Sequence, residues 1–252
     1  MLSMNPSLTV IIAAKNEAHN IVDCIKSAAF ANEVLVLDSG SSDNTVALAI
    51  AAGATVLQTD WPGYGPQQNR GLDAAKHDWI YSLDADERIT PALADEIKLA
   101  ISKNEFNVFD VPRKSFFVTQ FMNHSGWWPD RTRRLWKRNS ARFTNHEIHA
   151  NLATDEPVGH LTEHMIHHSF LSLDAAIEKM NRYSSGSARD LNARGKSGSL
   201  SKAIGHGLWA FFRTYIIRRG FLDGKAGFIL AVANAEGTYY RYLKLMLLSE
   251  KS

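Results

Sequence analysis

LTVIIAA, residues 8–14, is a continuous apolar run of the kind that forms a strand buried on both faces of a sheet. Apolar residues at helical spacing follow at residues 21–29, and VLVL at residues 34–37 predicts a second buried strand. The alternation continues with an expected helix at 45–52, a strand at 54–58, a helix through 70–75, a strand at 79–83 and a helix from 91 to about 104. This α/β pattern predicts a doubly wound, mostly parallel central sheet with helices on both faces.

Composition is that of an ordinary globular protein. The chain has 252 residues, of which 45% are hydrophobic and 21% charged, which excludes a disordered chain. Cys24 is the single cysteine, so an internal disulfide is excluded and a reducing, cytoplasmic location is expected. The first residues have no basic segment before their apolar run, and they predict a strand rather than a signal peptide.

Polar and acidic residues follow three of the predicted strands at the point where each strand ends. They are Lys15-Asn16-Glu17, Asp38-Ser39-Gly40 and Asp84-Ala85-Asp86. Ligands of open α/β sheets bind outside the carboxyl ends of the strands, so the three groups should meet at one edge. Gathered carboxylates repel one another unless a positive charge lies among them. A Mg²⁺ or Mn²⁺ ion with a phosphorylated ligand would supply that charge.

Other phosphate-binding patterns do not follow these strands. Neither G-x-G-x-x-G nor G-x-x-x-x-G-K-[ST] occurs at a strand-to-helix turn, which disfavours Rossmann-type dinucleotide binding and P-loop chemistry. An alternative interpretation of the Asp84/Asp86 pair is an acidic cap for the helix that follows.

The three motifs together resemble those of family 2 inverting glycosyltransferases. The matching stretches are VIIAAKNE at 10–17, VLDSGSSDNT at 36–45 and SLDADE at 82–87. The resemblance implies a GT-A fold, a UDP-sugar donor and a divalent metal, Mn²⁺ or Mg²⁺. It places Glu17 and Asp38 at the nucleoside, Asp84 at the ribose or sugar, and Asp86 on the metal. Further donor-binding positions implied are Ala13, Lys15, Asp43, Asn69, Arg70 and Ala85. His167 resembles a family position close to the active centre and is implied as a second metal ligand, with a structural histidine held by ordinary hydrogen bonds as the alternative.

The middle of the chain supplies candidates for acceptor binding and for the general base. Strands are expected at 106–112 and 115–119, followed by a segment rich in Trp and Arg. Tryptophan faces suit sugar rings and arginines suit anionic groups, so Trp127, Trp128, Arg131 and Arg134 are predicted to bind the acceptor. An exposed basic hairpin without a ligand is the alternative.

The segment also resembles a subset of the family that includes lipopolysaccharide-core beta-glucosyltransferases. That resemblance rests on Pro129-Asp130, Arg134-Leu135 and His146-Glu147. It implies Glu147 as the general base and Asp130 as the second choice. The commoner downstream Glu-Asp and Gln-x-x-Arg-Trp signatures of the family are absent from the chain.

A rival from another reaction class is a zinc peptidase. His160, Glu163 and His164 match H-x-x-E-H, which requires a helix for zinc binding. The residues around them favour strands instead.

The C-terminal part is basic and aromatic. Residues 176–252 hold 13 Lys and Arg against 5 Asp and Glu, whereas residues 1–175 hold 15 against 21. Two apolar stretches lie near the C-terminus, at 208–219 and 228–248. Each contains fewer than 18 uninterrupted apolar residues, so a membrane-spanning helix is not expected. Helices that lie on an anionic membrane surface are predicted, with a helical bundle or a dimer contact as the alternative. A nucleic-acid-binding protein is a further alternative, but no recognition motif is present.

The sequence pattern and the resemblance together predict a catalytic domain at 1–170, with a donor half at 1–105 and an acceptor half at 106–170, and a helical region at 171–252. The resemblance implies that the catalytic domain has the GT-A fold. It also implies that the activity is transfer of a sugar, with glucose favoured, from a UDP-sugar to a lipid-linked anionic acceptor such as the lipopolysaccharide inner core. The enzyme is expected at the inner face of the cytoplasmic membrane, without a nucleic-acid partner, and a homo-oligomer is left open.

Overall fold

The computed structural model describes residues 7–144 and 151–249, which pack as two compact units. Of the described residues, the first unit comprises 7–113, 131–144 and 151–167, and the second comprises 114–130 and 168–249. Residues 114–130 thus group with the C-terminal helices, and strands β6 and β12 each continue from one unit into the other. The domain boundary expected at residue 170 stays a prediction.

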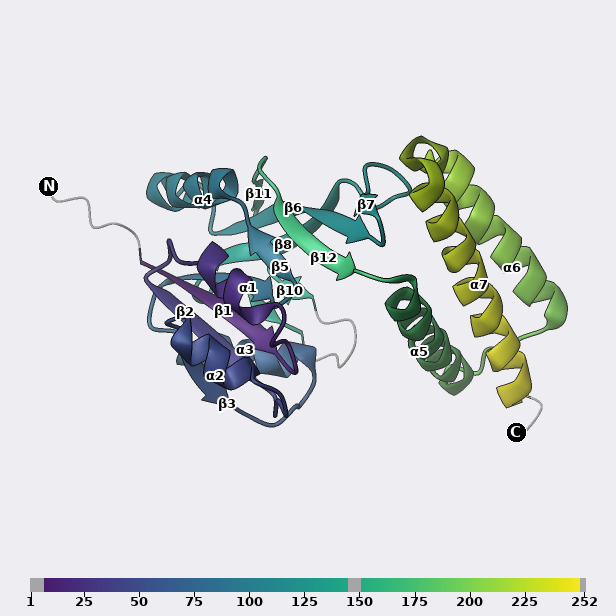
Figure 1. The fold of residues 1–252 in the computed structure, drawn as a ribbon, viewed down its shortest axis with the longest axis horizontal. Coiled ribbons are helices and arrows are strands. Elements are labelled where there is room, and N and C mark those ends of the chain that lie inside the picture. Colours follow the sequence, from purple (N-terminus) through teal and green to yellow (C-terminus); the bar gives the residue numbers. More distant parts are fainter. Residues whose placement is uncertain (1–6, 145–150, 250–252) are drawn as a thin grey trace, which may run out of the picture. The chain divides into compact units, whose positions relative to one another are not determined.

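The N-terminal half alternates strands and helices as the sequence predicts (Figure 1). Its elements are β1 (Leu8–Ala14), α1 (Ile21–Ser27), β2 (Glu33–Asp38), α2 (Thr45–Ala51), β3 (Thr55–Gln58), α3 (Tyr64–Ala74), β4 (Trp79–Asp84), β5 (Glu87–Ile89) and α4 (Pro91–Lys103). Thr90 caps α4 by accepting a hydrogen bond from the Leu93 N–H at 3.2 Å, and Pro91 follows at the first helical position. Asn104 ends the helix in a left-handed conformation.

The remaining strands are mostly short. They are β6 (Val108–Phe117), β7 (Gln120–Phe121), β8 (Asp130–Lys137), β9 (Arg142–Phe143), β10 (Leu152–Ala153), β11 (Val158–His160) and β12 (Met165–Phe170). The expectation of two separate strands at 106–112 and 115–119 was wrong, because β6 runs through both as one strand. Pro112 lies within it, since a proline removes one N–H donor but tolerates extended backbone.

The central sheet is parallel on one side and mixed on the other. Its strands follow the order β3-β2-β1-β4-β8-β6-β12-β5. The first four pair in parallel, whereas β8 pairs antiparallel with β4, and β12 pairs antiparallel with β5. The doubly wound α/β class is therefore confirmed, and a side of mixed strand direction extends the parallel part.

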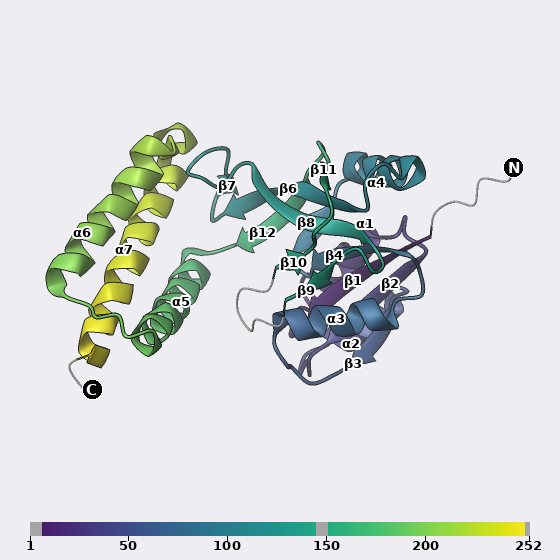
Figure 2. The ribbon, with the colours of Figure 1, turned by 180° about the vertical axis from the view of Figure 1, so that it is seen from behind.

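Helices cover both faces of this sheet (Figures 1 and 2). Val10 and Ile12 of β1 pack with α1, α2 and α4, whereas Ile11 points to the opposite face and packs with α3. This alternation is the two-residue period of a strand that is buried on both sides. Gly71 allows α3 to approach the sheet, because a Cβ there would lie 2.5 Å from Ile11 Cγ2.

The second unit is mainly helical. Its helices are α5 (Leu173–Ala193), α6 (Leu200–Phe212), the π-helical turn η1 (Arg213–Ile217), the 3₁₀ turn η2 (Gly220–Asp223) and α7 (Gly224–Ser249). Ser172 caps α5 by accepting a hydrogen bond from the Ala175 N–H at 3.1 Å. A small core forms where Phe117 and Met122 meet Ala226 and Leu230 of α7. Among the described residues, no helix is long and apolar enough to cross a membrane.

Candidate active site

The carboxyl ends of β1, β2 and β4 bring the predicted acidic groups to one edge of the sheet. In the parallel registers, Ala14 lies beside Asp38, and Ala13 lies beside Asp84. The Ser39 N–H also donates to the Ala14 carbonyl at 3.0 Å. Asp38 and Asp84 therefore flank the same strand end, as the parallel topology predicts.

Asp38 organises the loop that follows β2. Its side chain is buried, with 1% of its surface exposed. One carboxylate oxygen accepts hydrogen bonds from the Gly40 and Ser41 N–H groups at 3.1 and 3.0 Å, and the Ser41 hydroxyl donates to the other. Gln67 of α3 donates to the Ser39 hydroxyl at 3.1 Å. The loop is thus held in place before any ligand arrives.

The loop after β1 is bonded to the loop after β2. Asn16 has a left-handed φ of 57° and accepts from the Ser42 N–H at 2.8 Å, while its own N–H donates to the Ser41 hydroxyl at 2.9 Å. The Glu17 N–H donates to the Thr45 hydroxyl at 2.8 Å. Burial raises the pKa of Glu17 against the opposing hydrogen bond from Asn20, and the nearby charge of Asp86 raises it further.

Three other predicted donor positions lie in the same region. Asp43 precedes the cap residue of α2, Asn44, which makes no side-chain hydrogen bond to the helix. The Asp43 carboxylate instead accepts from the Thr45 N–H at 3.0 Å and from the Ala18 N–H at 3.2 Å. Lys15 is exposed, and Ala13 is half-buried at the end of β1.

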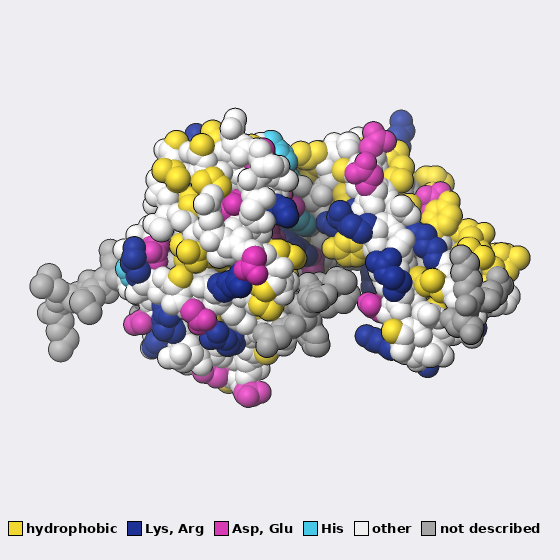
Figure 3. Space-filling view, turned by 90° about the horizontal axis from the view of Figure 1, so that it is seen from below, with side chains coloured by type: hydrophobic (Ala, Val, Ile, Leu, Met, Phe, Trp, Pro, Cys, Tyr) yellow, Lys and Arg dark blue, Asp and Glu magenta, His cyan; other side chains and the backbone are white. Residues whose placement is uncertain are grey.

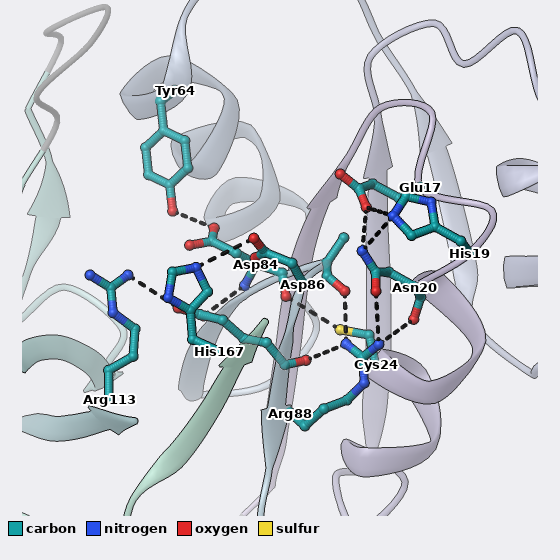
Figure 4. A network of polar contacts seen from close by, with 12 residues as sticks. Glu17, His19, Asn20, Cys24, Tyr64, Asp84, Asp86, Arg88, Arg113 and His167 are labelled. Carbon is teal, nitrogen blue, oxygen red and sulfur yellow. Dashed lines mark hydrogen bonds and ion pairs between the residues drawn. The ribbon is translucent and has the colours of Figure 1, made fainter. Parts of the chain in front are cut away.

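Asp84 lies at the centre of a charged network (Figure 4). Tyr64 of α3 donates its hydroxyl to Asp84 at 2.7 Å, and Arg134 of β8 donates to the second carboxylate oxygen at 2.7 Å. The same Arg134 nitrogen lies 2.6 Å from Glu87, whose other oxygen accepts from the Asp84 N–H at 3.0 Å. Arg134 therefore binds the carboxylates at both ends of the turn from Asp84 to Glu87.

Burial and charge act in opposite directions on these two carboxyl groups. Burial favours the neutral acid at Asp84, but the positive charge and hydrogen bond of Arg134 outweigh it, so the pKa of Asp84 is lowered. Glu87 is fully buried, and this desolvation raises its pKa despite Arg134. Asp84 thus remains ionised in the folded protein at neutral pH.

Asp86 and His167, the two predicted metal ligands, lie together. His167 Nε2 is 3.3 Å from Asp86 Oδ2, and the two side chains are 12% and 30% exposed. The pairing of β12 with β5 sets this contact, since His167 lies opposite Glu87, the residue after Asp86. In Figure 4 the imidazole of His167 reaches toward Asp86 from the strand that carries it.

This pair fits a divalent cation. Neighbouring ligands about 2.1 Å from an octahedral metal lie about 3 Å apart, which matches the 3.3 Å between Asp86 and His167. Among the described residues, no group of three or more His, Cys, Asp or Glu side chains converges on one point. Two protein ligands are enough for a cation that takes its remaining ligands from water and substrate phosphates.

The remaining predicted donor residues have partners elsewhere in the first unit. The side-chain amide of Asn69 binds the backbone of Phe143: its nitrogen donates to the carbonyl at 2.9 Å, and its oxygen accepts from the N–H at 3.0 Å. Arg70 is paired with Asp60 at 2.5 Å, and Ala85 is buried in the turn between Asp84 and Asp86. Their donor contacts stay predictions.

The predicted acceptor residues are divided between the two units. Trp127 and Trp128 lie in the second unit, where Trp127 packs against Phe117 and Lys114 lies 4.4 Å above the Trp128 ring. Arg131 lies in the first unit and binds the Leu161 carbonyl at 2.7 Å and Asp110 at 3.1 Å. Arg134 is only 4% exposed and holds Asp84 and Glu87, so the geometry gives it a positioning role.

The candidate general bases are placed only in part. Asp130 is half-buried at the first residue of β8. Glu147 lies outside the described residues, and its predicted role stays a prediction.

The zinc-peptidase alternative fails on secondary structure. His160 is the last residue of β11 and its Nδ1 lies 2.8 Å from Asp110, while Glu163 and His164 follow in a loop. The motif is thus not helical, and it does not form the zinc site that the alternative requires.

The sequence reasoning did not identify Tyr64, Glu87 and Arg113 as parts of the site. Tyr64 contacts Asp84, and Arg113 lies 3.4 Å from Glu87. Glu87 had a local signal, because it directly follows the Asp84-Ala85-Asp86 motif. Tyr64 of α3 and Arg113 of β6 are distant from that motif in the sequence, and only the tertiary fold brings them close to it.

Comparison with known proteins defines the class to which this fold and site belong. Residues 9–169 match the family model described as glycosyl transferase family 2, and the chain belongs to that family. An uncharacterized glycosyltransferase of Rickettsia bellii is 30% identical over 98% of this chain and 88% of its own length. The lipopolysaccharide core biosynthesis glycosyltransferase LpsC of Rhizobium meliloti is 28% identical over 93% of each chain. The chain is therefore a nucleotide-sugar glycosyltransferase.

A likeness to solved structures covers a smaller part of the chain. Glucosyl-3-phosphoglycerate synthase of Mycobacterium tuberculosis, solved with Mn²⁺, UDP and glucosyl-3-phosphoglycerate, is 28% identical with a TM-score of 0.38. The match spans 44% of this chain and 44% of that one.

Proposed function

We propose that this glycosyltransferase moves a sugar, with glucose favoured, from a UDP-sugar to a lipid-linked anionic glycan of the lipopolysaccharide inner-core type, with inversion at the anomeric carbon. The observation that carries the proposal is the meeting of Asp38, Asp84 and Asp86 at one edge of a parallel sheet, with His167 beside Asp86. The similarity to LpsC over nearly the whole chain supports the choice of acceptor.

The proposed donor site lies at the loops after β1 and β2, which hydrogen bonds within the protein already hold in place. Glu17 and Asp38 are proposed to face the nucleoside, because carboxylates accept hydrogen bonds from ribose hydroxyls and from the uracil N–H. Asp84 faces the ribose or the sugar, and the hydrogen bonds from Tyr64 and Arg134 fix its orientation. A preformed site of this kind binds without the entropic cost of ordering its side chains.

Asp86 and His167 are the residues that would hold a divalent cation, Mn²⁺ or Mg²⁺. When bound, such a cation stabilises the negative charge that develops on the departing diphosphate. Arg134 compensates the charge of Asp84, and the loop after β2 binds both oxygens of Asp38, whereas Asp86 lies beside His167, the other proposed ligand.

Transfer also requires a base for the acceptor hydroxyl. Glu147 is proposed to accept that proton, with Asp130 as the alternative. Loss of a general base typically lowers the rate by about 10²–10⁴-fold. Glu147→Ala should therefore slow transfer by this factor and leave UDP-sugar binding unchanged.

The proposed acceptor would require the enzyme to work at a membrane surface. We expect a lipid-linked acceptor at the inner face of the cytoplasmic membrane, where a cytoplasmic UDP-sugar would be available. Trp127, Trp128 and Arg131 remain the proposed contacts to the sugar and to its anionic groups.

The test is a thermal-shift screen of nucleotide sugars with and without Mn²⁺ or Mg²⁺, followed by transfer to a lipopolysaccharide acceptor. A donor that binds the folded form raises the melting temperature. We expect UDP-glucose with a cation to give the largest shift, and the product to carry the inverted anomer by NMR. No shift with any UDP-sugar would contradict the proposal.

A further inference from the structure

Helix α6 has one face of small residues and one of large apolar residues. Ala203, Gly207 and Ala210 are buried, and a Cβ at Gly207 would lie 3.3 Å from the Tyr239 Cβ of α7. On the opposite face, Leu208, Trp209 and Phe212 are 69%, 53% and 47% exposed. The helix therefore packs on α7 through its small side and presents its large apolar side chains to the surroundings.

The exposed apolar surface continues around the turn that joins α6 to α7. Ile216, Ile217, Phe221, Leu222 and Phe228 are between 44% and 55% exposed. We call these five residues, together with Leu208, Trp209 and Phe212, the hairpin surface. Figure 3 shows hydrophobic side chains gathered over the C-terminal helices, with Lys and Arg side chains near them. Exposed apolar surface of this extent marks an interaction site.

The charges beside the hairpin surface are almost all positive. Arg213, Arg218, Arg219 and Lys225 lie within it in sequence and are exposed. Asp223, the one acidic residue between positions 200 and 235, is 3% exposed. A second copy of the chain would bring like charges together, whereas an anionic lipid surface complements both the cations and the apolar side chains.

We propose that the hairpin surface inserts into the interfacial region of an anionic lipid bilayer. The inference rests on the proposed function, because a lipid-linked acceptor requires the enzyme to work at such a surface. Aromatic and aliphatic side chains enter the acyl boundary, and the arginines remain at the lipid headgroups.

Asp223 connects this surface to the loop that carries the predicted acceptor residues. Its carboxylate accepts from the Asn123 and His124 N–H groups at 2.9 and 3.0 Å and from the Ser125 hydroxyl at 2.9 Å. The Ser125 N–H also donates to the Arg218 carbonyl at 2.8 Å. Insertion of Phe221 and Leu222 would therefore place the loop that leads to Trp127 and Trp128 close to the lipid headgroups.

The experiment is co-sedimentation of the full chain with vesicles of phosphatidylcholine alone or with added phosphatidylglycerol. We expect binding to the anionic vesicles that weakens in high salt. Replacing Trp209, Phe221 and Leu222 together by serine should lower the partition coefficient at least tenfold. Arg218→Gln and Arg219→Gln should each lower it about fivefold, the factor that corresponds to about 1 kcal/mol. Ile50→Ser and Leu99→Ser, at side chains 59% and 53% exposed on α2 and α4, are matched controls and should change nothing.

Three outcomes would overturn the inference. They are equal binding by the wild type and the triple variant, no binding to either vesicle, and a dimer in analytical ultracentrifugation that the triple variant dissociates. UDP-sugar binding, followed by thermal shift on the same samples, separates this inference from the proposed function. If donor binding persists while vesicle binding is absent, the inference fails alone, and if donor binding is absent, the proposed function fails.

Discussion

His167 Nε2 lies 3.3 Å from Asp86 Oδ2, and the antiparallel pairing of β12 with β5 holds the two residues at that separation. The contact joins a turn that follows a parallel strand, β4, to a strand of the mixed side of the sheet, β12. The mixed side therefore completes the site that the parallel strands begin.

His167→Ala should weaken metal activation. Loss of one of two protein ligands is expected to raise the Mn²⁺ concentration needed for half-maximal transfer by about 10-fold or more. Saturating Mn²⁺ should restore most of the rate. His160→Ala is the matched control, since that side chain is 66% exposed and bound to Asp110. An equal loss in both variants would contradict the assignment of His167.

Arg134→Gln should destabilise the fold strongly. Arg134 and Glu87 side chains are 5% and 0% exposed, and removal of one partner of a buried pair costs about 3–5 kcal/mol. Urea unfolding followed by circular dichroism would measure this loss. Arg142→Gln breaks a pair with Asp73 whose side chains are 57% and 60% exposed, and it should cost about 0–1 kcal/mol. Similar losses in the two variants would contradict the role given to Arg134.

Glu33→Gln should reduce stability at neutral pH and not at acid pH. Burial of the Glu33 carboxyl is outweighed by hydrogen bonds from Lys76 and Thr9, so its pKa is lowered from the usual 4.5. A lowered pKa in the folded state gives stability that is present above pH 4.5 and is lost as the pH falls through the lower value. We expect a difference of about 1–3 kcal/mol at pH 7 that shrinks below pH 4. A difference that is independent of pH would contradict this.

Asp223→Asn should affect the acceptor more than the donor. The amide nitrogen of asparagine cannot accept the hydrogen bonds that the carboxylate takes from residues 123–125, at a cost of about 1–3 kcal/mol. The KM for acceptor should rise while UDP affinity remains at the wild-type value. Equal effects on acceptor and donor would indicate general loss of structure instead.

The sequence predicted the parallel half of the fold closely because its signals are local. Apolar runs mark β1, β2 and β4, and Thr90 with Pro91 marks the start of α4. The convergence of Asp38 and Asp84 followed from the parallel topology alone.

The contacts that hold the site were harder to predict because they join distant segments. Arg134 lies in a run of basic residues, a pattern that is typical of an exposed surface. It is nevertheless buried between Asp84 and Glu87. The reason is register: β8 pairs antiparallel with β4, with Leu135 opposite Tyr81, so Arg134, the residue before Leu135, lies toward the end of β4 that carries Asp84. Asp223 likewise has no sequence signal that links it to residues 123–125.

Calorimetric measurement of UDP binding by Asp86→Ala, with and without Mn²⁺, tests directly whether Asp86 holds a cation beside the diphosphate. The site described above predicts that Mn²⁺ increases the affinity of the wild type for UDP and leaves that of Asp86→Ala unchanged. Asp73→Ala, at an exposed carboxylate of α3, should behave as the wild type. If Asp86→Ala kept the full gain in affinity from Mn²⁺, the cation would be held elsewhere and the assignment would be wrong.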